Sequence, residues 1–272
     1  MSPWILVAIV AAITALWVGQ RIAKERRRAE AIQRQLSADE QRWVAAAVRQ
    51  YKHLPAELKQ RLNNHVKLFL DEKRFEGCDG FELELQHCVM VAASACYLCI
   101  GREEPPFANT SLIQLYPSAF VTPARPLSLD GNPVHHGDTR LGESSHMGIV
   151  VLSWPDVEAG FADRGTNVVL HEFAHQLDQA DGLADGTPEL EESNYRQWGA
   201  EFSRAFLHLR SQIEQRLNPS LDPYGATNEA EFFAVVSEAF FDQPTSLRRD
   251  FARVFELLQR YYRYDPINLR AL

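Results

Sequence analysis

Two histidines four residues apart, His171 and His175, constrain this chain more than any other feature of its sequence. Residues at this spacing on an α-helix lie nearly above one another, so the two imidazoles point to one place. Zinc binds imidazole nitrogen readily, and Glu172, directly after the first histidine, is placed to act as a general base on a zinc-activated water. The spacing therefore predicts a helix that holds a catalytic metal ion.

The positions around these histidines predict a buried or cleft-facing helix. Its other faces are apolar, with Val168, Val169, Leu170, Phe173, Ala174 and Leu177. Polar side chains on such a helix are costly unless they are paired. A chance occurrence of the motif on a solvated surface helix is therefore disfavoured.

Charge is unevenly distributed along the 272 residues, whose formal net charge is −8. Residues 1–36 carry six basic and two acidic residues, which leaves 22 basic and 34 acidic residues, a net charge of −12, for the rest. Phosphate binding requires a basic face, so nucleic acid is excluded as a partner. The four cysteines, Cys78, Cys88, Cys96 and Cys99, fit small buried thiols better than a metal or redox site.

The segment from Pro3 to Gly19 is apolar except for Thr14, with Trp4 and Trp17 near its ends. Its length, about 17 residues, is at the short limit of a membrane span, and tryptophan is common at membrane interfaces. A cleaved signal peptide is disfavoured because basic residues follow the apolar run and none precedes it. We therefore expect an N-terminal transmembrane helix.

This anchor predicts the domain organisation and the location of the protein. Residues 1–20 would be the membrane anchor, 21–36 a charged helical linker near anionic headgroups, and 37–272 the catalytic domain. The basic residues after the anchor predict a single-pass protein of the bacterial inner membrane whose catalytic domain is cytoplasmic.

The remaining pattern predicts a mainly helical α+β domain with a small sheet. Helices are expected from the Ser37–Glu40 capping box, from Pro55, and over Phe81–Ile100, Glu189–Leu217, Glu229–Phe241 and Leu247–Tyr261. Strands are expected at Ser111–Val121 and Gly148–Ser153. Thr166 is expected to cap the metal-binding helix, and His135 and His136 to lie on a loop surface. The second strand is either internal or an edge on which an extended peptide lies.

A catalytic zinc with two histidine ligands needs a third protein ligand. Asp178 and Asp181 stand where the longer HExxHxxGxxH motif has Gly and His, which excludes that class. Glu191 and Glu192 lie near the spacing of a thermolysin-like ligand, but the aspartate of that pattern is missing. Asp178 is also a candidate acceptor for an imidazole N–H, with a plain loop role as the alternative.

Two further glutamates, Glu231 and Glu238, lie on the apolar helix predicted at residues 229–241. They are seven residues apart and therefore share one face of the helix. Buried carboxylates need partners, and a zinc ion or a ligand histidine would supply one. The pattern alone does not choose between the two.

Three stretches together resemble the Mlc titration factor A family of bacterial zinc metallopeptidases. They are HEFAHQLD at 171–178, VVLSW at 150–154 and AEFFAVVSE at 230–238. The segment YGATNEAEFFA at 224–234 is also similar to the catalytic domain of anthrax lethal factor. The resemblance covers most of residues 40–265. It implies a zincin-like (gluzincin) metallopeptidase domain with one Zn²⁺ per chain and a peptide substrate.

The resemblance also implies roles for individual residues. The third ligand of that family is the first glutamate of an Ala-Glu-x-Phe-Ala segment, here Glu231. The tyrosine seven residues earlier, here Tyr224, assists catalysis, and Glu238 is then expected beside the ligands. The implied activity is aminopeptidase-like cleavage of short peptides. The family is also implied to sequester the glucose-responsive repressor Mlc, so the alternative is a regulator-binding protein with secondary peptidase activity.

Overall fold

The computed structural model describes residues 3–103, 107–118, 120–121, 139–140, 142–145, 148–162 and 166–272. These residues form a mainly helical fold with a small sheet, as the sequence predicted. His135 and His136 lie outside the described residues.

The described helices begin and end as follows. They are α1 (Pro3–Gln33), α2 (Ala38–Ala47), α3 (Ala56–Glu72), α4 (Leu85–Tyr97), α5 (Trp154–Phe161), α6 (Val168–Asp178), α7 (Tyr195–Glu214), α8 (Glu229–Asp242), α9 (Pro244–Asp250) and α10 (Ala252–Tyr262). Short 3-10 turns are η1 (Arg49–His53), η2 (Gln179–Asp181), η3 (Glu192–Asn194) and η4 (Pro223–Ala226). The predicted capping box is present, because the Ser37 side chain accepts from the Glu40 N–H and the Glu40 side chain from the Ser37 N–H.

Four strands form the main sheet, in the order β1-β2-β6-β5. Their bounds are β1 (Arg74–Gly77), β2 (Leu112–Tyr116), β5 (Gly142–Ser145) and β6 (Ile149–Ser153), and two-residue strands pair elsewhere as β3 (Phe120–Val121) with β4 (Thr139–Arg140) and β7 (Tyr264–Asp265) with β8 (Arg270–Ala271). β1, β2 and β6 are parallel, and β5 runs antiparallel to β6. The strand predicted at Gly148–Ser153 is therefore internal, and β5 forms the edge of this sheet in the described part of the chain.

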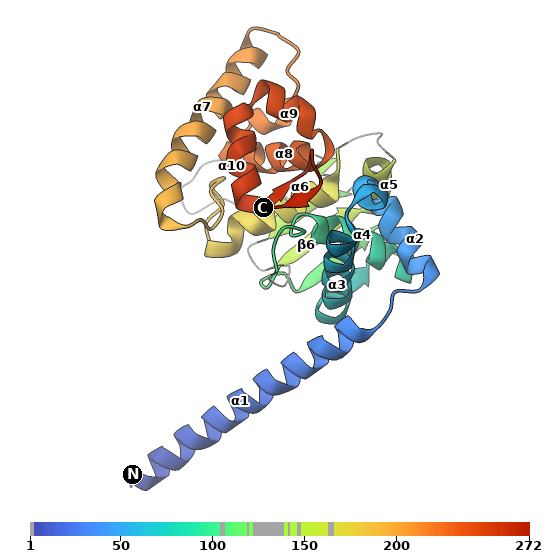
Figure 1. Ribbon diagram of the computed structural model, residues 1–272, viewed down its shortest axis with the longest axis vertical. Helices are drawn as coiled ribbons and strands as arrows, with labels where there is room; N and C mark the ends of the chain where they lie inside the picture. Colours follow the sequence, from blue (N-terminus) through green and yellow to red (C-terminus); the bar gives the residue numbers. More distant parts are fainter. Residues whose placement is uncertain are drawn as a thin grey trace.

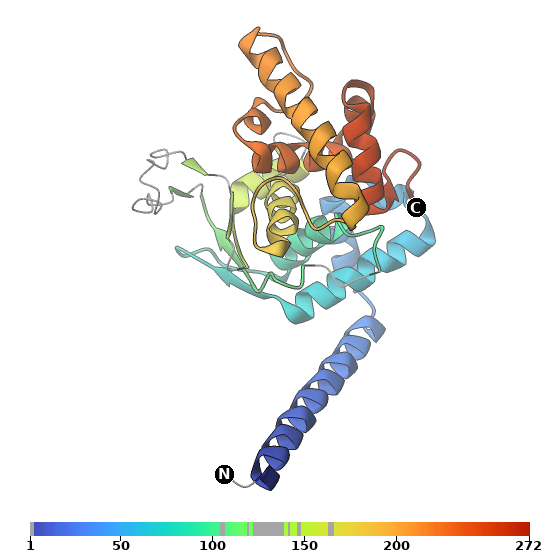
Figure 2. The ribbon, with the colours of Figure 1, turned by 90° about the vertical axis from the view of Figure 1, so that its left-hand side faces the viewer.

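Helix α6 lies between the two halves of the body (Figure 1). On one side are the sheet and α4, which packs against α2, α3 and α6. On the other side are α7 to α10, with α8 directly against α6 (Figure 2). Because parallel strands joined by a helix bury that helix on the sheet, the apolar α4 becomes central, and its residues from Val89 to Tyr97 are all buried.

The α7 to α10 half is built around aromatic side chains. Trp198 stacks on Phe202, with ring centroids 4.0 Å apart, and its indole N–H donates to the Gly186 carbonyl at 3.2 Å. The helix predicted over Leu247–Tyr261 is interrupted at Phe251, which separates α9 from α10. Phe251 has an extended φ of −132° and is buried, so the chain turns there to pack both short helices on α8.

The predicted transmembrane helix is wrong. Within the part of the chain that the structure describes, no helix combines the length and the apolar character needed to cross a membrane. A span needs about 20 mostly apolar residues, whereas the apolar part of α1 ends by Gly19 and contains alanines and a threonine. The predicted single-pass inner-membrane location with a cytoplasmic domain is therefore not supported, nor is membrane contact through residues 3–19.

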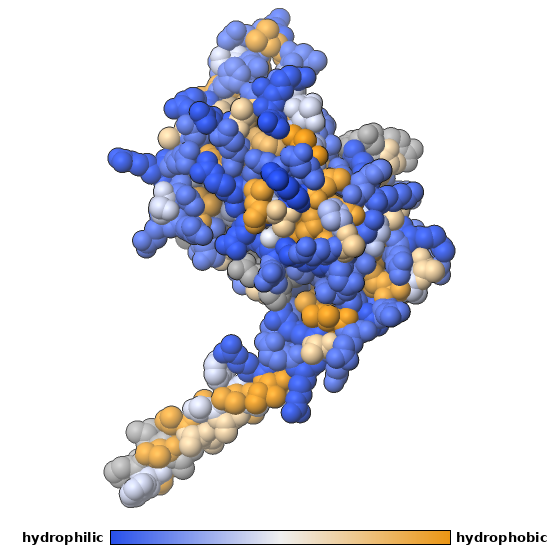
Figure 3. Space-filling model, viewed as in Figure 1, coloured by the Kyte–Doolittle hydropathy of each residue, from blue (hydrophilic) through white to orange (hydrophobic). Residues whose placement is uncertain are grey.

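Helix α1 is one continuous helix that joins the predicted anchor and linker and projects from the body (Figures 1 and 2). Hydrophobic side chains lie on its surface (Figure 3). Trp4 and Leu16 are among the exposed residues of this helix. Two of its basic residues bind α3: Arg27 pairs with Asp71 at 2.8 Å and Arg28 with Glu72 at 2.6 Å. These ion pairs account for part of the basic cluster, which the sequence analysis expected to lie near anionic lipid headgroups.

We predict that Gly101→Ala destabilises the fold. A Cβ at this position, just after α4, would overlap the backbone carbonyl oxygens of Tyr262 and Arg263 at the end of α10. Backbone cannot rotate away as a side chain does, so the free energy of unfolding should fall by about 1–3 kcal/mol. Urea unfolding of the purified variant measures this loss.

Gly199→Ala is the matched control. Gly199 lies in α7, and no atom of another element lies within 4 Å of the place that an alanine methyl group would take. Alanine should therefore raise the free energy of unfolding by about 0.5–1 kcal/mol. If the Gly101 variant is as stable as wild type, the prediction is wrong. The chain after α4 and the end of α10 would then move apart without a loss of stability.

Candidate metal centre

Helix α6 presents His171 and His175 on one face. Asn167 caps the helix, since its side-chain oxygen accepts from the Leu170 N–H at 3.3 Å. The prediction that Thr166 caps it is one residue off. The two imidazole rings lie 4.9 Å apart and nearly perpendicular, as expected for residues one turn apart. Both histidines are buried, at 7% and 9% exposure.

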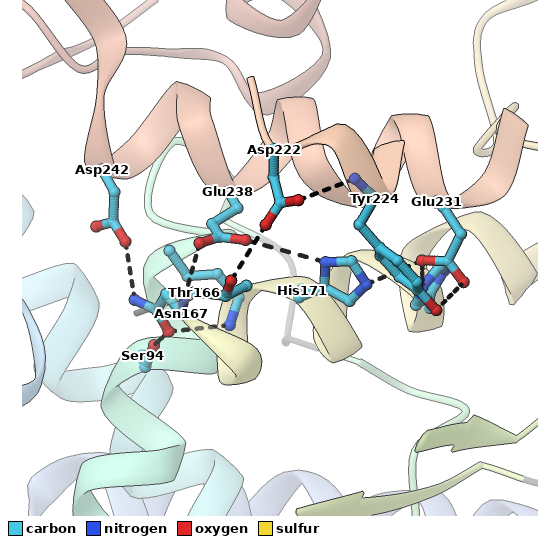
Figure 4. A network of polar contacts seen from close by, with 11 residues as sticks. Ser94, Thr166, Asn167, His171, Asp222, Tyr224, Glu231, Glu238 and Asp242 are labelled. Atoms are coloured by element: carbon cyan, nitrogen blue, oxygen red, sulfur yellow. Dashed lines mark hydrogen bonds and ion pairs between the residues drawn. The ribbon is translucent and has the colours of Figure 1, made fainter. Parts of the chain in front are cut away.

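Helix α8 brings Glu231 to these histidines. Its Oε2 atom lies 3.0 Å from Nε2 of His171 and 3.2 Å from Nε2 of His175 (Figure 4). Asn228 caps α8 by accepting from the Glu231 N–H at 2.9 Å, which fixes where the first turn begins. One donor atom from each of the three residues lies within 4.8 Å of the others.

The three side chains are electrostatically coupled. Burial alone would raise the pKa of Glu231, but hydrogen bonds and charge attraction from the two histidines hold it well below its ordinary value. Burial alone would lower the pKa of His171, but its hydrogen bond to Glu231 and the charges of Glu172 and Glu238 raise it instead. An ionised carboxylate thus lies between the two imidazole rings.

This donor set fits a divalent metal ion. Two imidazole nitrogens and one carboxylate oxygen are the protein ligands of catalytic zinc sites that keep a position open. The second nitrogen of His171, Nδ1, is buried and has no hydrogen-bond partner among the residues that the structure describes. Nitrogen and oxygen donors aimed at one point fit zinc better than calcium or magnesium, which prefer oxygen.

Glu172 and Tyr224 flank the three donors. Glu172 follows His171 on α6 and is only 6% exposed. Tyr224 lies in η4, and its hydroxyl is 3.5 Å from Oε1 of Glu231. Its ring centroid is 6.0 Å from that of His171, and the residue is 52% exposed. The tyrosine therefore lies at the open side of the cluster.

Asp222 holds the turn that carries Tyr224. Its Oδ1 accepts from the Tyr224 N–H at 2.9 Å, and its Oδ2 accepts from the Thr166 hydroxyl at 3.4 Å (Figure 4). Gly225 is buried there, and a Cβ on it would press against Val235 of α8. The turn is thus attached both to the start of α6 and to α8.

Glu238 lies beside the donor cluster and not within it. Its carboxylate accepts from the Asn167 N–H at 2.7 Å, and its other oxygen is 3.9 Å from Nδ1 of His171. Burial raises the pKa of Glu238 to about 7. Of the two glutamates that the sequence left open, the structure therefore brings Glu231 to the imidazole Nε2 atoms.

The remaining sequence candidates lie elsewhere. Glu191 is exposed and approaches Arg263 at 3.9 Å, and neither it nor Glu192 joins the three-residue group in the residues that the structure describes. Asp178 is fully buried, and its Oδ2 accepts from the Gly186 N–H at 3.0 Å. Asp178 therefore has the loop role that the sequence analysis gave as the alternative to accepting an imidazole N–H.

Sequence reasoning missed Asn167, Asp222 and Asp242. Asn167 donates its side-chain N–H to Asp242 at 3.1 Å as well as capping α6. An asparagine just before an apolar helix is a cap signal, so Asn167 could have been found. Asp222 could also have been found, because an aspartate before Pro223 is a cap signal and its side chain accepts from the Tyr224 N–H. The contacts of Asp222 with Thr166 and of Asp242 with Asn167 could not, because these partners lie more than 50 residues away in the chain.

Two histidines and a glutamate converge on one point, with a half-buried second glutamate beside them, and this arrangement is typical of proteins whose helices carry a metal site. The family model described as glucose-regulated metallo-peptidase M90 matches residues 22–263. The chain therefore belongs to this metallopeptidase family, and the family resemblance seen in the sequence is confirmed.

Curated relatives agree with this assignment. The uncharacterized protein slr2042 of Synechocystis sp. is 39% identical over 223 residues, covering 80% of each chain. Mlc titration factor A of Yersinia pestis is 35% identical over 159 residues, covering 57% of this chain and 58% of that protein. The same values hold for Mlc titration factor A of Yersinia pseudotuberculosis.

We predict that Asp178→Asn stabilises the metal-free protein at neutral pH. Burial raises the pKa of Asp178 to about 6 from an ordinary value of 3.8, so the folded state favours the protonated form. The wild-type carboxylate therefore costs little below about pH 4, and the cost grows to roughly 3 kcal/mol as the pH rises through 6. Asparagine keeps an acceptor for Gly186 and has no charge.

Urea unfolding between pH 4 and 8 measures this difference, with Asp181→Asn in the exposed part of the same loop as the control. The gain of the Asp178 variant should appear between pH 4 and 6 and stay constant above. If the variant is more stable than wild type by the same amount at pH 4 as at pH 8, the Asp178 carboxyl group does not take up a proton in the folded state and the prediction is wrong.

Proposed function

We propose that this chain is a zinc-dependent peptidase with one zinc ion per chain, held by His171, His175 and Glu231. The observation that carries this proposal is the convergence of one donor atom from each residue within 4.8 Å. Membership of a metallopeptidase family supports the reaction type and a peptide substrate. The gluzincin ligand set, two histidines from one helix and a glutamate from another, is consistent with how α6 and α8 meet.

Glu172 is proposed as the general base. A zinc ion bound there would supply Lewis-acid chemistry, lowering the pKa of water to about 7 and polarising the scissile carbonyl. Glu172 follows a ligand directly and is buried, so its carboxylate is held near the attacking water. It takes the proton from that water and later gives it to the leaving amine.

Tyr224 is proposed to stabilise the oxyanion that forms on the substrate carbonyl. Its hydroxyl lies 3.5 Å from Glu231, at the exposed side of the cluster, where a substrate carbonyl can reach it. A fixed hydroxyl donor stabilises charge that develops in the transition state and costs no reorganisation. Asp222 and Gly225 hold the turn that positions it.

The substrate is proposed to bind as an extended strand along β5. This strand is the edge of the main sheet in the described residues, and it contacts α6. An edge strand offers unpaired backbone N–H and C=O groups to a peptide, which gives affinity without requiring a particular sequence. Aminopeptidase-like cleavage of short peptides remains part of the proposal on the basis of the family resemblance.

A second candidate function is binding of a transcriptional repressor of the Mlc type. The observation that favours it is the 35% identity to proteins named Mlc titration factor A. In this alternative, peptide hydrolysis is secondary. Calorimetric titration of the purified chain with a purified Mlc-type repressor tests it, and binding that persists after zinc removal would separate it from the peptidase activity.

We predict that Glu172→Gln keeps the zinc ion but loses turnover. Glutamine preserves the shape of the side chain but cannot accept the proton, so kcat should fall by about 10²–10⁴-fold. Zinc content by atomic absorption is compared with hydrolysis of a panel of aminoacyl and internally quenched peptides. Cleavage of only those peptides that have free amino termini would identify an aminopeptidase.

Near-normal turnover of this variant would remove Glu172 as the base. Zinc bound by wild type without cleavage of any peptide would leave the repressor-binding function as the better explanation.

We predict that Tyr224→Phe lowers kcat by about 10²–10³-fold, the usual loss when one oxyanion donor is removed. KM and zinc content should change little, because the ring still packs near His171 and the hydroxyl is not proposed as a ligand. Steady-state kinetics on the best peptide of the panel measures both constants. Tyr195→Phe, whose hydroxyl accepts from the Leu190 N–H away from the donors, is the control. A change confined to KM would assign Tyr224 to substrate binding instead.

A further inference from the structure

Glu238 faces two nitrogen atoms at the start of α6 with its two carboxylate oxygens. One oxygen accepts from the Asn167 N–H at 2.7 Å, and the other lies 3.9 Å from Nδ1 of His171 (Figure 4). The Glu238 side chain is only 16% exposed, so water does not replace either partner freely. Both neighbours are donors or can become donors.

The two nitrogens of His171 face different glutamates. Nε2 lies 3.0 Å from Glu231, on the side of the proposed zinc site, whereas the buried Nδ1 lies toward Glu238. A neutral imidazole that gives its Nε2 lone pair to a metal carries its proton on Nδ1. A buried N–H needs an acceptor, and Nδ1 has no hydrogen-bond partner in the described structure.

Three other carboxylates near the start of α6 and His171 have different partners. Asp242 accepts from the Asn167 side chain, and Asp222 accepts from Thr166 and Tyr224. Glu231 faces the opposite nitrogen of the ring. The terminal torsion of a glutamate side chain has a broad minimum, so a small rotation brings the second oxygen of Glu238 within hydrogen-bond distance of Nδ1.

The packing of two helices places both glutamates at once. Glu231 meets His175 and His171, whereas Glu238, seven residues later, meets His171 and Asn167. The contacts move backward along α6 as they move forward along α8, so the helices run antiparallel. A rotation of α8 that removed Glu238 from His171 would also remove Glu231 from the histidines, because both share one face.

We propose that Glu238 is a positioning residue that accepts the Nδ1–H of His171 and the Asn167 N–H together, and so directs Nε2 of His171 toward the metal. This inference rests on the proposed zinc site but not on the reaction performed there. Its direct consequence concerns zinc affinity.

Glu238→Gln tests this role, because an amide has one acceptor oxygen where the carboxylate has two. In either orientation the glutamine turns its NH₂ group toward one of the two N–H donors. Zinc affinity of the full chain is measured by competition with a chromophoric chelator, and the tautomer of His171 by ¹⁵N NMR of the zinc-loaded protein. Glu229→Gln, an exposed change on the same helix, is the matched control.

We expect zinc affinity of the Glu238 variant to fall by about 10–100-fold, the usual effect of losing the partner of a ligand histidine. The control should match wild type, and wild-type His171 should carry its proton on Nδ1. Urea unfolding of the metal-free proteins distinguishes a positioning role of Glu238 from a purely structural one. A purely structural role would lower the free energy of unfolding and leave the zinc affinity of the folded protein unchanged.

Unchanged zinc affinity in Glu238→Gln would overturn the proposal, whatever its effect on unfolding. A wild-type chain that binds no zinc would overturn it together with the metal site. Zinc binding that weakens as expected in a protein that cleaves no peptide would support it and overturn only the peptidase assignment.

Discussion

The contact between α6 and α8 is the interaction on which the rest of the structure depends. It places the Glu231 carboxylate 3.0 and 3.2 Å from the Nε2 atoms of two buried histidines. Charged groups taken out of water are costly unless they are paired or bind a metal. Only one register of the two helices satisfies all three groups, and the same register sets Glu238 against the start of α6.

Aromatic side chains stabilise this register on the sides of α6 and α8 that face away from the metal-binding residues. On the apolar side of α6, Phe173 packs edge-on against Phe69 and Phe107, with ring centroids 5.7 and 4.8 Å away. On the far side of α8, Phe240 packs against Phe255 of α10 with ring centroids 5.2 Å apart. Such pairs contribute about 0.5–1.5 kcal/mol each beyond burial. The hydrophobic core therefore stabilises an arrangement of polar groups that would not form by itself.

Sequence patterns predicted what depends on spacing within one element, such as the paired histidines of α6 and the buried face of α8. They did not choose between Glu231 and Glu238, since these share a face and only packing against α6 distinguishes them. Helix α5 was not predicted, although Pro155 lies in its first turn, where proline is tolerated. The predicted membrane anchor was wrong because the apolar run of α1 is too short and not apolar enough to span a membrane. In the predicted linker, Arg27 and Arg28 bind α3.

Exposure divides the site into two parts that share one attachment. The histidines are at most 9% exposed, whereas Tyr224 is 52% exposed. Low polarity strengthens attraction among the buried groups, while the tyrosine lies on the side of the site that is open to solvent. Tyr224 is joined through Asp222 to Thr166, the residue before the cap of α6, and Glu238 binds the N–H of that cap. The first turn of α6 is therefore attached to three groups at once, the proposed ligand His171, Glu238 and the turn that carries Tyr224, so a displacement of that turn would disturb all three.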